Sequence, residues 1–184
     1  MSKLETNTID TVSGTTNLTI GSTNTSTITM PNGKLTGQNY PAFSARLTSD
    51  QTLTLDTLTK VQYNTEEFDT DSAYDNSTNY RFTVPSSKAG KYVISYTNYL
   101  KADALTAFSF GDCEIRKNGT AICDNFIDTR NGGNGHQFQI NNTVLLDLAV
   151  DDYIEIFARI SGSGTVRVIG SNYNSMFMGY RIGA

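Results

Sequence analysis

The sequence is poor in the side chains that most enzymes and nucleic-acid-binding proteins use. It has one histidine, two cysteines and no tryptophan in 184 residues. A single histidine leaves little for acid–base or zinc chemistry, because such sites combine histidine with further bases or ligands. Charged residues make up 17%, and 18 acidic residues against 14 basic ones give a net charge of −4. Lys and Arg form no cluster, so no nucleic acid is expected as a partner, since phosphate binding needs a basic surface.

Long hydrophobic runs are also missing. No apolar stretch approaches the ~20 residues with which a helix spans a membrane, so we expect no membrane insertion. The first ten residues, MSKLETNTID, contain no apolar core. We therefore expect no signal peptide.

What the sequence does contain is Thr, Asn, Ser and Gly, together with short runs of alternating apolar residues. Residues 90–96, GKYVISY, place Tyr92, Ile94 and Tyr96 at period two directly after a glycine, which predicts a strand with one large apolar face. About ten such short strands follow one another from residue 42 onward, and no window has the period of an amphipathic helix. The chain is therefore predicted to be all-β, as a sandwich or jelly roll.

Residues 1–40 differ from the rest of the chain. They are almost purely Thr, Asn, Ser and Gly, with isolated apolar pairs such as Leu18 with Ile20 and Ile28 with Met30. So little apolar surface does not offset the entropy of ordering the segment alone. Either it is a disordered leader, or it is an extended, β-rich arm that orders when chains associate or against another surface. We favour the arm, and predict residues 1–40 as an attachment arm or trimer shaft and residues 41–184 as a knob.

Two late strands carry large apolar side chains on both faces. In the strand that begins at Tyr153, Tyr153 and Phe157 lie on one face and two isoleucines on the other. In the strand at residues 175–182, Tyr180 and Phe177 lie on opposite faces. A two-layer sandwich covers only one face of each sheet, so a neighbouring subunit is expected to cover the other. The pattern therefore predicts an oligomer.

Cys113 and Cys123 flank Asn118-Gly119, a predicted hairpin tip. A two-residue turn there places Cys113 opposite Asp124 and not opposite Cys123. We therefore expect two reduced thiols, with one or both in the apolar interior.

Candidate chemistry is sparse. Asp69, Asp71 and Asp75 lie in one short acidic segment, and carboxylates at such spacing converge on calcium in some proteins; the alternative is an exposed acidic turn. His136 with the two cysteines raises a thiol nucleophile as one interpretation, and a loop histidine beside structural thiols as the other, which we favour. We expect no enzyme activity and no cofactor, with calcium the one candidate ion.

With the strands placed, residues 42–184 resemble the globular head of the complement first component, within the tumour-necrosis-factor-like superfamily. The head's signature of spaced aromatic residues ending in Gly-x-Tyr-x-Phe-x-aromatic is matched with two stretched loops and Ile94 in place of the Phe. Further landmarks follow in the family's order, among them Phe43-Ser44-Ala45 and the closing segment 175–180. The matching signature positions are Tyr63, Asp69, Tyr74, Phe82, Gly90, Tyr92, Ile94 and Tyr96.

The resemblance implies a ten-stranded jelly roll that forms tight homotrimers, with one sheet of each subunit packed around a threefold axis. On this interpretation one set of side chains supplies the subunit core and the trimer interface, and for Tyr92, Tyr96, Phe177 and Tyr180 the alternative is a ligand platform. That set is Tyr92, Ile94, Tyr96, Tyr153, Phe157, Phe177 and Tyr180.

No Gly-X-Y collagen repeat precedes the knob, and residues 1–40 instead resemble bacteriophage fibre and decoration proteins. We therefore expect a homotrimeric virion structural protein, made in the host cytoplasm and placed on the virion surface. Residues 1–40 would contact other virion proteins, and loops at residues 49–57, 102–108 and 131–138 would bind a host-surface glycan or protein. Two alternatives stay open: a capsid decoration or cement trimer without a receptor, and a non-viral secreted complement-like adhesin.

Overall fold

The computed structural model describes residues 41–104, 107–131, 135–171 and 173–183. The predicted arm at residues 1–40 lies outside this part. The described residues form thirteen strands and no helix, and so no helix in this part is long and apolar enough to cross a membrane. The predicted all-β fold is confirmed.

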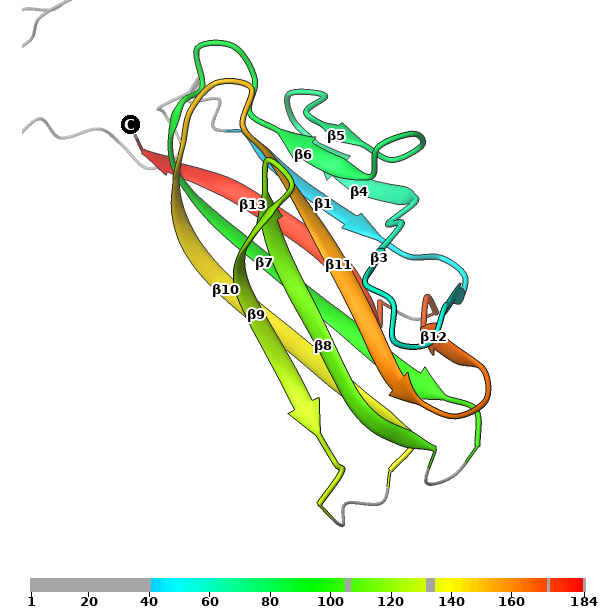
Figure 1. Cartoon of the computed structure of the whole chain (residues 1–184). Coiled ribbons are helices and arrows are strands. Elements are labelled where there is room, and N and C mark those ends of the chain that lie inside the picture. Colours follow the sequence, from blue (N-terminus) through cyan, green and yellow to red (C-terminus); the bar gives the residue numbers. More distant parts are fainter. Residues whose placement is uncertain (1–40, 105–106, 132–134, 172, 184) are drawn as a thin grey trace, which may run out of the picture. The chain divides into compact units, whose positions relative to one another are not determined.

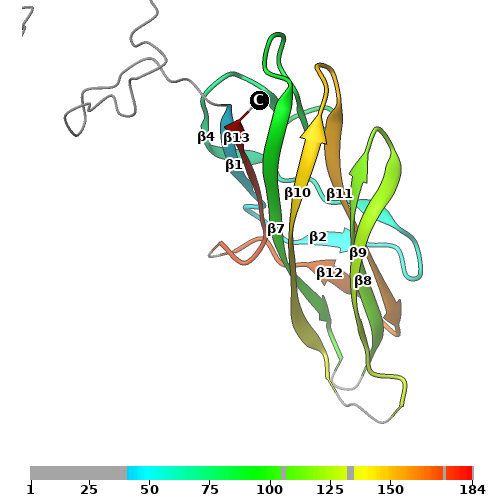
Figure 2. The same cartoon turned by 90° about the vertical axis from the view of Figure 1, so that its left-hand side faces the viewer.

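Two antiparallel sheets lie face to face (Figures 1 and 2). The first runs in the order β2, β12, β7, β13, β1, β4, and β10 pairs with β7 on its other side. Its strands are β1 (Ala42–Arg46), β2 (Gln51–Leu53), β4 (Thr65–Asp69), β7 (Gly90–Ala102), β10 (Gln137–Leu148), β12 (Val166–Val168) and β13 (Met176–Gly183). The second runs β5, β6, β11, β8, β9, with β3 also paired to β11. Its strands are β3 (Thr59–Lys60), β5 (Tyr74–Asp75), β6 (Arg81–Thr83), β8 (Phe108–Lys117), β9 (Thr120–Asp128) and β11 (Tyr153–Gly162).

The strand count exceeds the ten expected because several pieces are very short. Strands β2, β3 and β5 have two or three residues each. The alternation of side chains is clearest in β7, whose thirteen residues are alternately fully and partly buried over most of its length. β7 is thus the strand on which the first sheet is built, since β10, β12 and β13 all pair with it.

Within the core lies an aromatic cluster centred on Phe43, which is 1% exposed. Its ring stacks on Tyr74 and Phe82 at centroid distances of 5.4 and 4.7 Å and meets Phe177 edge-on at 4.9 Å. Tyr63 packs on the other side of Phe177, at 5.7 Å. The irregular spacing of the signature aromatics has its reason here, because turns and short strands of different length bring them to one point.

The buried tyrosines keep their hydroxyls bonded, as buried phenols do. Tyr63 donates to the Asn98 side-chain oxygen at 2.8 Å, and Tyr74 donates to the Tyr63 carbonyl at 3.1 Å. Tyr96 donates to the Cys113 carbonyl at 3.1 Å. Burial raises the pKa of the Tyr63, Tyr74 and Tyr96 hydroxyls far above their ordinary value, so these groups stay protonated donors.

The β8–β9 hairpin turns at Asn118 and Gly119, with φ of 52° and 80°. Positive φ at both positions is the backbone that an Asn-Gly turn supplies. A bulge after Ile115 then shifts the register by one residue, and Cys113 faces Asn125 rather than the predicted Asp124. Both cysteines are free, Cys113 buried and Cys123 partly buried, which confirms the expected thiols.

Candidate functional site

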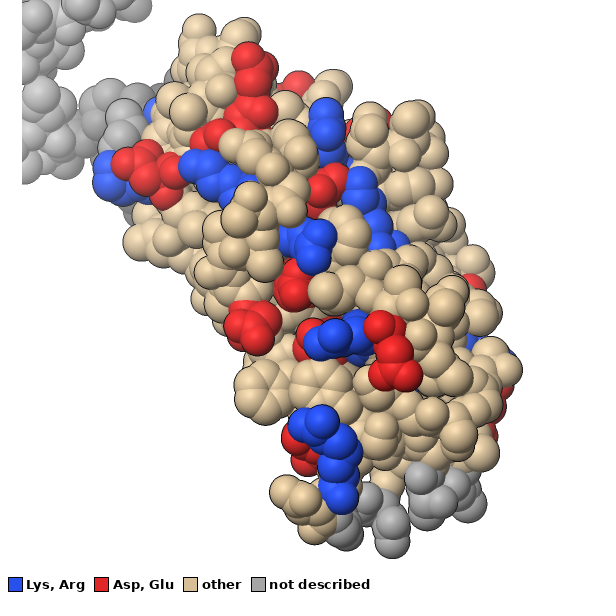
Figure 3. Space-filling model, viewed as in Figure 1, with Lys and Arg blue, Asp and Glu red and all other residues tan. Residues whose placement is uncertain are grey.

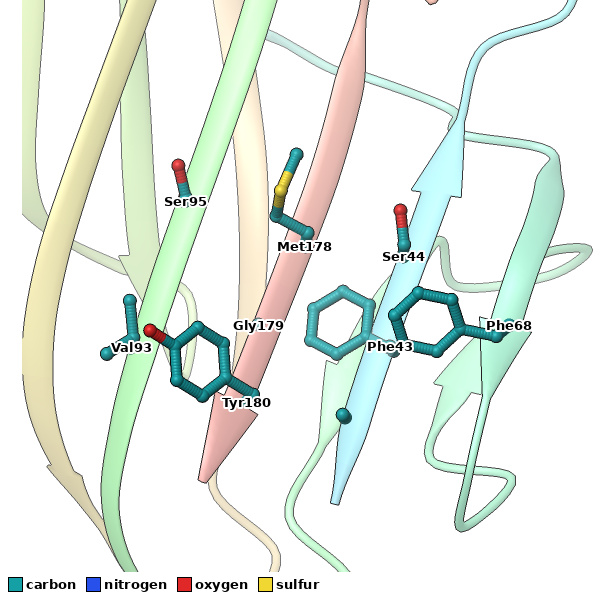
Figure 4. A pocket seen from close by; sticks show the side chains of 9 residues that line it. Phe43, Ser44, Phe68, Val93, Ser95, Met178, Gly179 and Tyr180 are labelled. Carbon is teal, nitrogen blue, oxygen red and sulfur yellow. The ribbon is translucent and has the colours of Figure 1, made fainter. Parts of the chain in front are cut away.

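The outer surface of the first sheet carries a continuous apolar area, which we call the apolar face and define by Ala42, Phe68, Val93, Leu145, Met178 and Tyr180. Strand register places these residues in two adjacent rows. Leu145 pairs with Val93, Val93 with Tyr180, and Tyr180 with Ala42, across β10, β7, β13 and β1. In the next row Met178 pairs with Ser44, and Ser44 with Phe68. Figure 4 shows the second row beside Tyr180 and Val93.

A depression of about 360 Å³ lies on this face, and it is lined by Phe68, Val93, Met178 and Tyr180, with Phe43 at its floor. Several of the apolar side chains around it are half exposed: Leu145 at 61%, Phe68 at 52% and Tyr180 at 51%. Gly179 forms part of the floor, and a side chain there would meet Phe43 and Ile94 at 2.8 Å. A continuous exposed apolar area of this kind is typical of a contact surface.

Toward the other end of the first sheet the outer surface becomes polar. Ser95 and Thr143 hydroxyls lie 2.8 Å apart, and the Gln139 amide donates to Thr97 at 3.0 Å. Cross-strand polar pairs of this kind hold register on an exposed sheet. The apolar face therefore has a defined boundary.

The outer surface of the second sheet is different, because cationic side chains of the same chain cover its aromatic rings. Arg81 lies over Tyr153 at 4.2 Å from the ring centroid, and Arg116 and Lys60 lie over Phe157 at 4.3 and 5.8 Å. Guanidinium and ammonium groups pack well on aromatic faces. On β11 the chain itself therefore provides cover for Tyr153 and Phe157, and the expectation that a neighbouring subunit covers them stays a prediction.

The remaining residues predicted for core or interface divide between two places. Tyr92, Ile94, Tyr96 and Phe177 lie in the core, each at most 1% exposed, while Tyr180 lies on the apolar face. Phe68, Val93 and Leu145 of that face were not among the predicted residues. Val93 and Leu145 alternate along their strands with partly or fully buried neighbours. Their position on the opposite face was therefore the pattern in the sequence that could have identified them.

The three candidate calcium ligands do not come together as a metal site. No group of three or more His, Cys, Asp or Glu side chains in the described ranges is placed to hold an ion. Asp69 accepts the Tyr74 backbone amide at 2.7 Å, and Asp75 accepts the amides of Thr78 and Ser77 at 2.8 and 3.0 Å. These backbone hydrogen bonds lower the pKa of Asp75 well below its ordinary 3.8. Asp69 and Asp75 thus shape turns, and the calcium interpretation finds no support.

The interpretation of Cys113 as a nucleophilic thiol is not supported either. Cys113 is fully buried, and burial raises the pKa of its thiol to about 12. A thiol that is protonated at neutral pH is a poor nucleophile. His136 contributes its backbone carbonyl to the Ala102 amide at 2.7 Å, a structural bond at the end of β7.

Neither a scan of protein-family models nor a search of curated proteins finds a match for this chain. Solved structures share its fold. The globular domain of the zebrafish complement 1qA protein is 13% identical, with a TM-score of 0.55 over 78% of this chain and 98% of that one. Murine APRIL is 7% identical with a TM-score of 0.58, over 78% of this chain and 100% of that one. Eiger TNF from S. frugiperda is 8% identical with a TM-score of 0.59, over 78% and 93%. The knob therefore has the jelly-roll fold of these proteins.

Proposed function

We propose that this chain is a homotrimeric, non-enzymatic knob that works by assembly and recognition, and that it stands on the surface of a virus particle. The apolar face is the observation that carries the trimer. Six mostly apolar positions on five strands lie together on one sheet. Closed threefold packing of that sheet would remove all of them from water without leaving an open edge for further growth.

The apolar character of this surface suits a permanent contact rather than a brief encounter. Obligate subunit interfaces are more apolar than the rest of a protein surface. The apolar face has that character at its centre, and the Ser, Thr and Gln pairs at its margin provide a polar rim. The structural neighbours, complement 1qA and tumour-necrosis-factor ligand domains, support a role in binding rather than catalysis by their fold.

The place on a virion rests on residues 1–40, whose Thr-, Asn-, Ser- and Gly-rich sequence resembles bacteriophage fibre and decoration proteins. In this proposal the segment attaches the knob to other virion proteins. The knob then presents its loops to the host surface. Extended at ~3.3 Å per residue, forty residues would reach on the order of 100 Å, enough to lie along a shaft or shell.

Two measurements test the proposal. The mass of the full chain in solution should be three times that of the 20.1 kDa subunit, and a stable monomer at micromolar concentration would refute the trimer. Particles assembled with residues 1–40 deleted should lack the knob. Normal incorporation of the deleted protein would refute the attachment role. If the intact particle incorporates the protein but does not bind the host, the result would support the alternative of a decoration protein without a receptor.

A further inference from the structure

A second cavity, which we call the end pocket, includes Asp56 of the predicted recognition loop at residues 49–57 and residues of β8 and β11. It has a volume of about 470 Å³ and is lined by Asp56, Ser109, Phe110, Arg130, Arg159 and Ser161. Figure 1 shows the ends of β7, β9 and β11 at the same end of the sandwich. The volume lies within the range of small-ligand sites.

Backbone hydrogen bonds fix the walls of the end pocket. The Asp56 amide donates to Ile160 at 3.0 Å, and the Thr129 amide donates to Ser109 at 2.9 Å. The Ser163 amide donates to Ala107 at 3.0 Å. A side chain on Gly162 would lie 2.0 Å from the Ala107 carbonyl oxygen, so this close approach needs glycine. The site is therefore formed before any ligand arrives, which lowers the entropic cost of binding.

Both arginines are held by a carboxylate on the strand side of the pocket. Arg159 makes a forked pair with Asp112 at 2.8 and 3.1 Å, and Asp112 is only 4% exposed. Arg130 pairs in the same way with Asp128. Their guanidinium carbons lie 5.4 and 5.2 Å from the centre of the Phe110 ring. Each arginine is thus oriented in advance, and the N–H groups outside its fork stay available to a ligand.

The charge of the site argues against an anionic ligand. Asp56, Asp112 and Asp128 provide three carboxylates, whereas Arg130 and Arg159 provide two guanidiniums. Figure 3 shows the same mixture of opposite charges over the face formed by β8, β9 and β11. The site therefore has no excess of positive charge to offset the free-energy cost of desolvating a phosphate or a sugar acid.

The functional groups that do face the end pocket match a neutral sugar ring. Arginine N–H groups donate, the exposed Asp56 carboxylate accepts, and the Ser109 and Ser161 hydroxyls do both. A pyranose needs that combination, because each of its hydroxyls both donates and accepts. Phe110 adds apolar surface to the lining beside these polar groups, and Phe126 stacks on its ring at 5.8 Å.

We propose that the end pocket binds a neutral hexopyranose unit of a host-surface glycan. This assignment rests on the proposed recognition function, and it names the part of the knob that performs it. The two interaction surfaces then lie on different sheets, the apolar face on the first and the end pocket beside the second. Assembly and glycan binding are thereby separated.

The test uses the full-length protein on an immobilised panel of neutral and sialylated oligosaccharides, followed by titration of the strongest ligand. Two variants remove groups from the end pocket. Asp56→Asn suits the backbone, because Asp56 has a φ of 57° and Asn tolerates that conformation. Arg130→Ala removes an exposed donor, and the buried Asp112 keeps its partner Arg159. The matched control is Arg116→Ala, since Arg116 also pairs with a neighbouring carboxylate, Glu114 at 2.7 Å, and also stacks on a phenylalanine.

A neutral glycan should bind, with its Kd raised at least tenfold by each pocket variant and unchanged by the control. Binding restricted to sialylated glycans, equal loss in all three variants, no loss in any, or no binding across the panel would each overturn the assignment. Adsorption of the protein to host cells, measured in parallel, separates the two proposals. Adsorption without glycan binding refutes the end-pocket assignment alone, whereas the absence of adsorption refutes host recognition itself.

Discussion

Leu145→Asp should convert the proposed trimer into monomers while leaving the knob folded. Leu145 lies on β10 at the outer edge of the apolar face and keeps 61% of its side chain exposed in the single subunit. Complete burial of a leucine is worth about 1.5–3 kcal/mol, so burying the remaining exposed part contributes about 1–2 kcal/mol per subunit. A threefold assembly counts this contribution three times, about 3–6 kcal/mol in total, and 1.4 kcal/mol changes an equilibrium tenfold.

The substitution should therefore raise the dissociation constant of the trimer by roughly 10²–10⁴-fold, before the repulsion of three carboxylates is added. Sedimentation velocity over a concentration series measures it, and far-ultraviolet circular dichroism checks the fold. Phe126→Asp is the control, because Phe126 is similarly exposed at 58% but lies on the second sheet. Unchanged association of Leu145→Asp, or equal dissociation by both variants, would contradict the location of the interface.

Three further predictions concern the subunit itself. Phe43→Ala should lower the free energy of unfolding by about 3–5 kcal/mol, because it opens a cavity among three packed rings; a loss under 1 kcal/mol in urea titration would show that the cluster is not the core. Asp75→Ala should cost about 1 kcal/mol at neutral pH, and the difference from wild type should shrink as acid titrates the carboxylate. The sign follows from the lowered pKa of Asp75, since its stabilisation is present above pH ~4 and lost as pH falls through the folded value; a cost independent of pH would refute it. At pH 7.5 a thiol reagent should label Cys123 quickly and Cys113 only after unfolding, because burial raises the pKa of Cys113 to about 12; rapid labelling of both would contradict the buried position.

The long strands were predictable because their alternation survives in the sequence. Period two in residues 90–96 correctly indicates the buried face of β7, and Asn118-Gly119 correctly indicates the β8–β9 turn. Strand β4 was not predicted, since its polar residues Glu66 and Glu67 give no apolar alternation, and it is ordered by pairing with β1. The same limit explains the shifted cysteine register, because a bulge leaves no mark in hydrophobic patterning.

The end pocket was beyond sequence reasoning for a further reason. Asp56, Phe110, Arg130 and Arg159 stand far apart in the chain, and each is ordinary in its own strand or turn. Their meeting depends on the antiparallel pairing that sets Phe110 opposite Ser161 and Asp128. Sequence reasoning did select the loops around this end, at residues 49–57, 102–108 and 131–138, because recognition commonly uses loops on a rigid scaffold.

The cover of the aromatic side chains favours one of the two sheets for the proposed assembly. Large apolar residues on both faces of a strand predicted a covering partner without saying which sheet it covers. On the second sheet Tyr153 and Phe157 are covered by Arg81, Arg116 and Lys60 of the same chain, and burying them further would desolvate those charges. On the apolar face no comparable cation lies over Tyr180 or Phe68 among the described contacts, so burial there removes hydrocarbon from water at little electrostatic cost. The favourable contact is therefore through the first sheet, which leaves the charged second sheet and the end pocket facing outward.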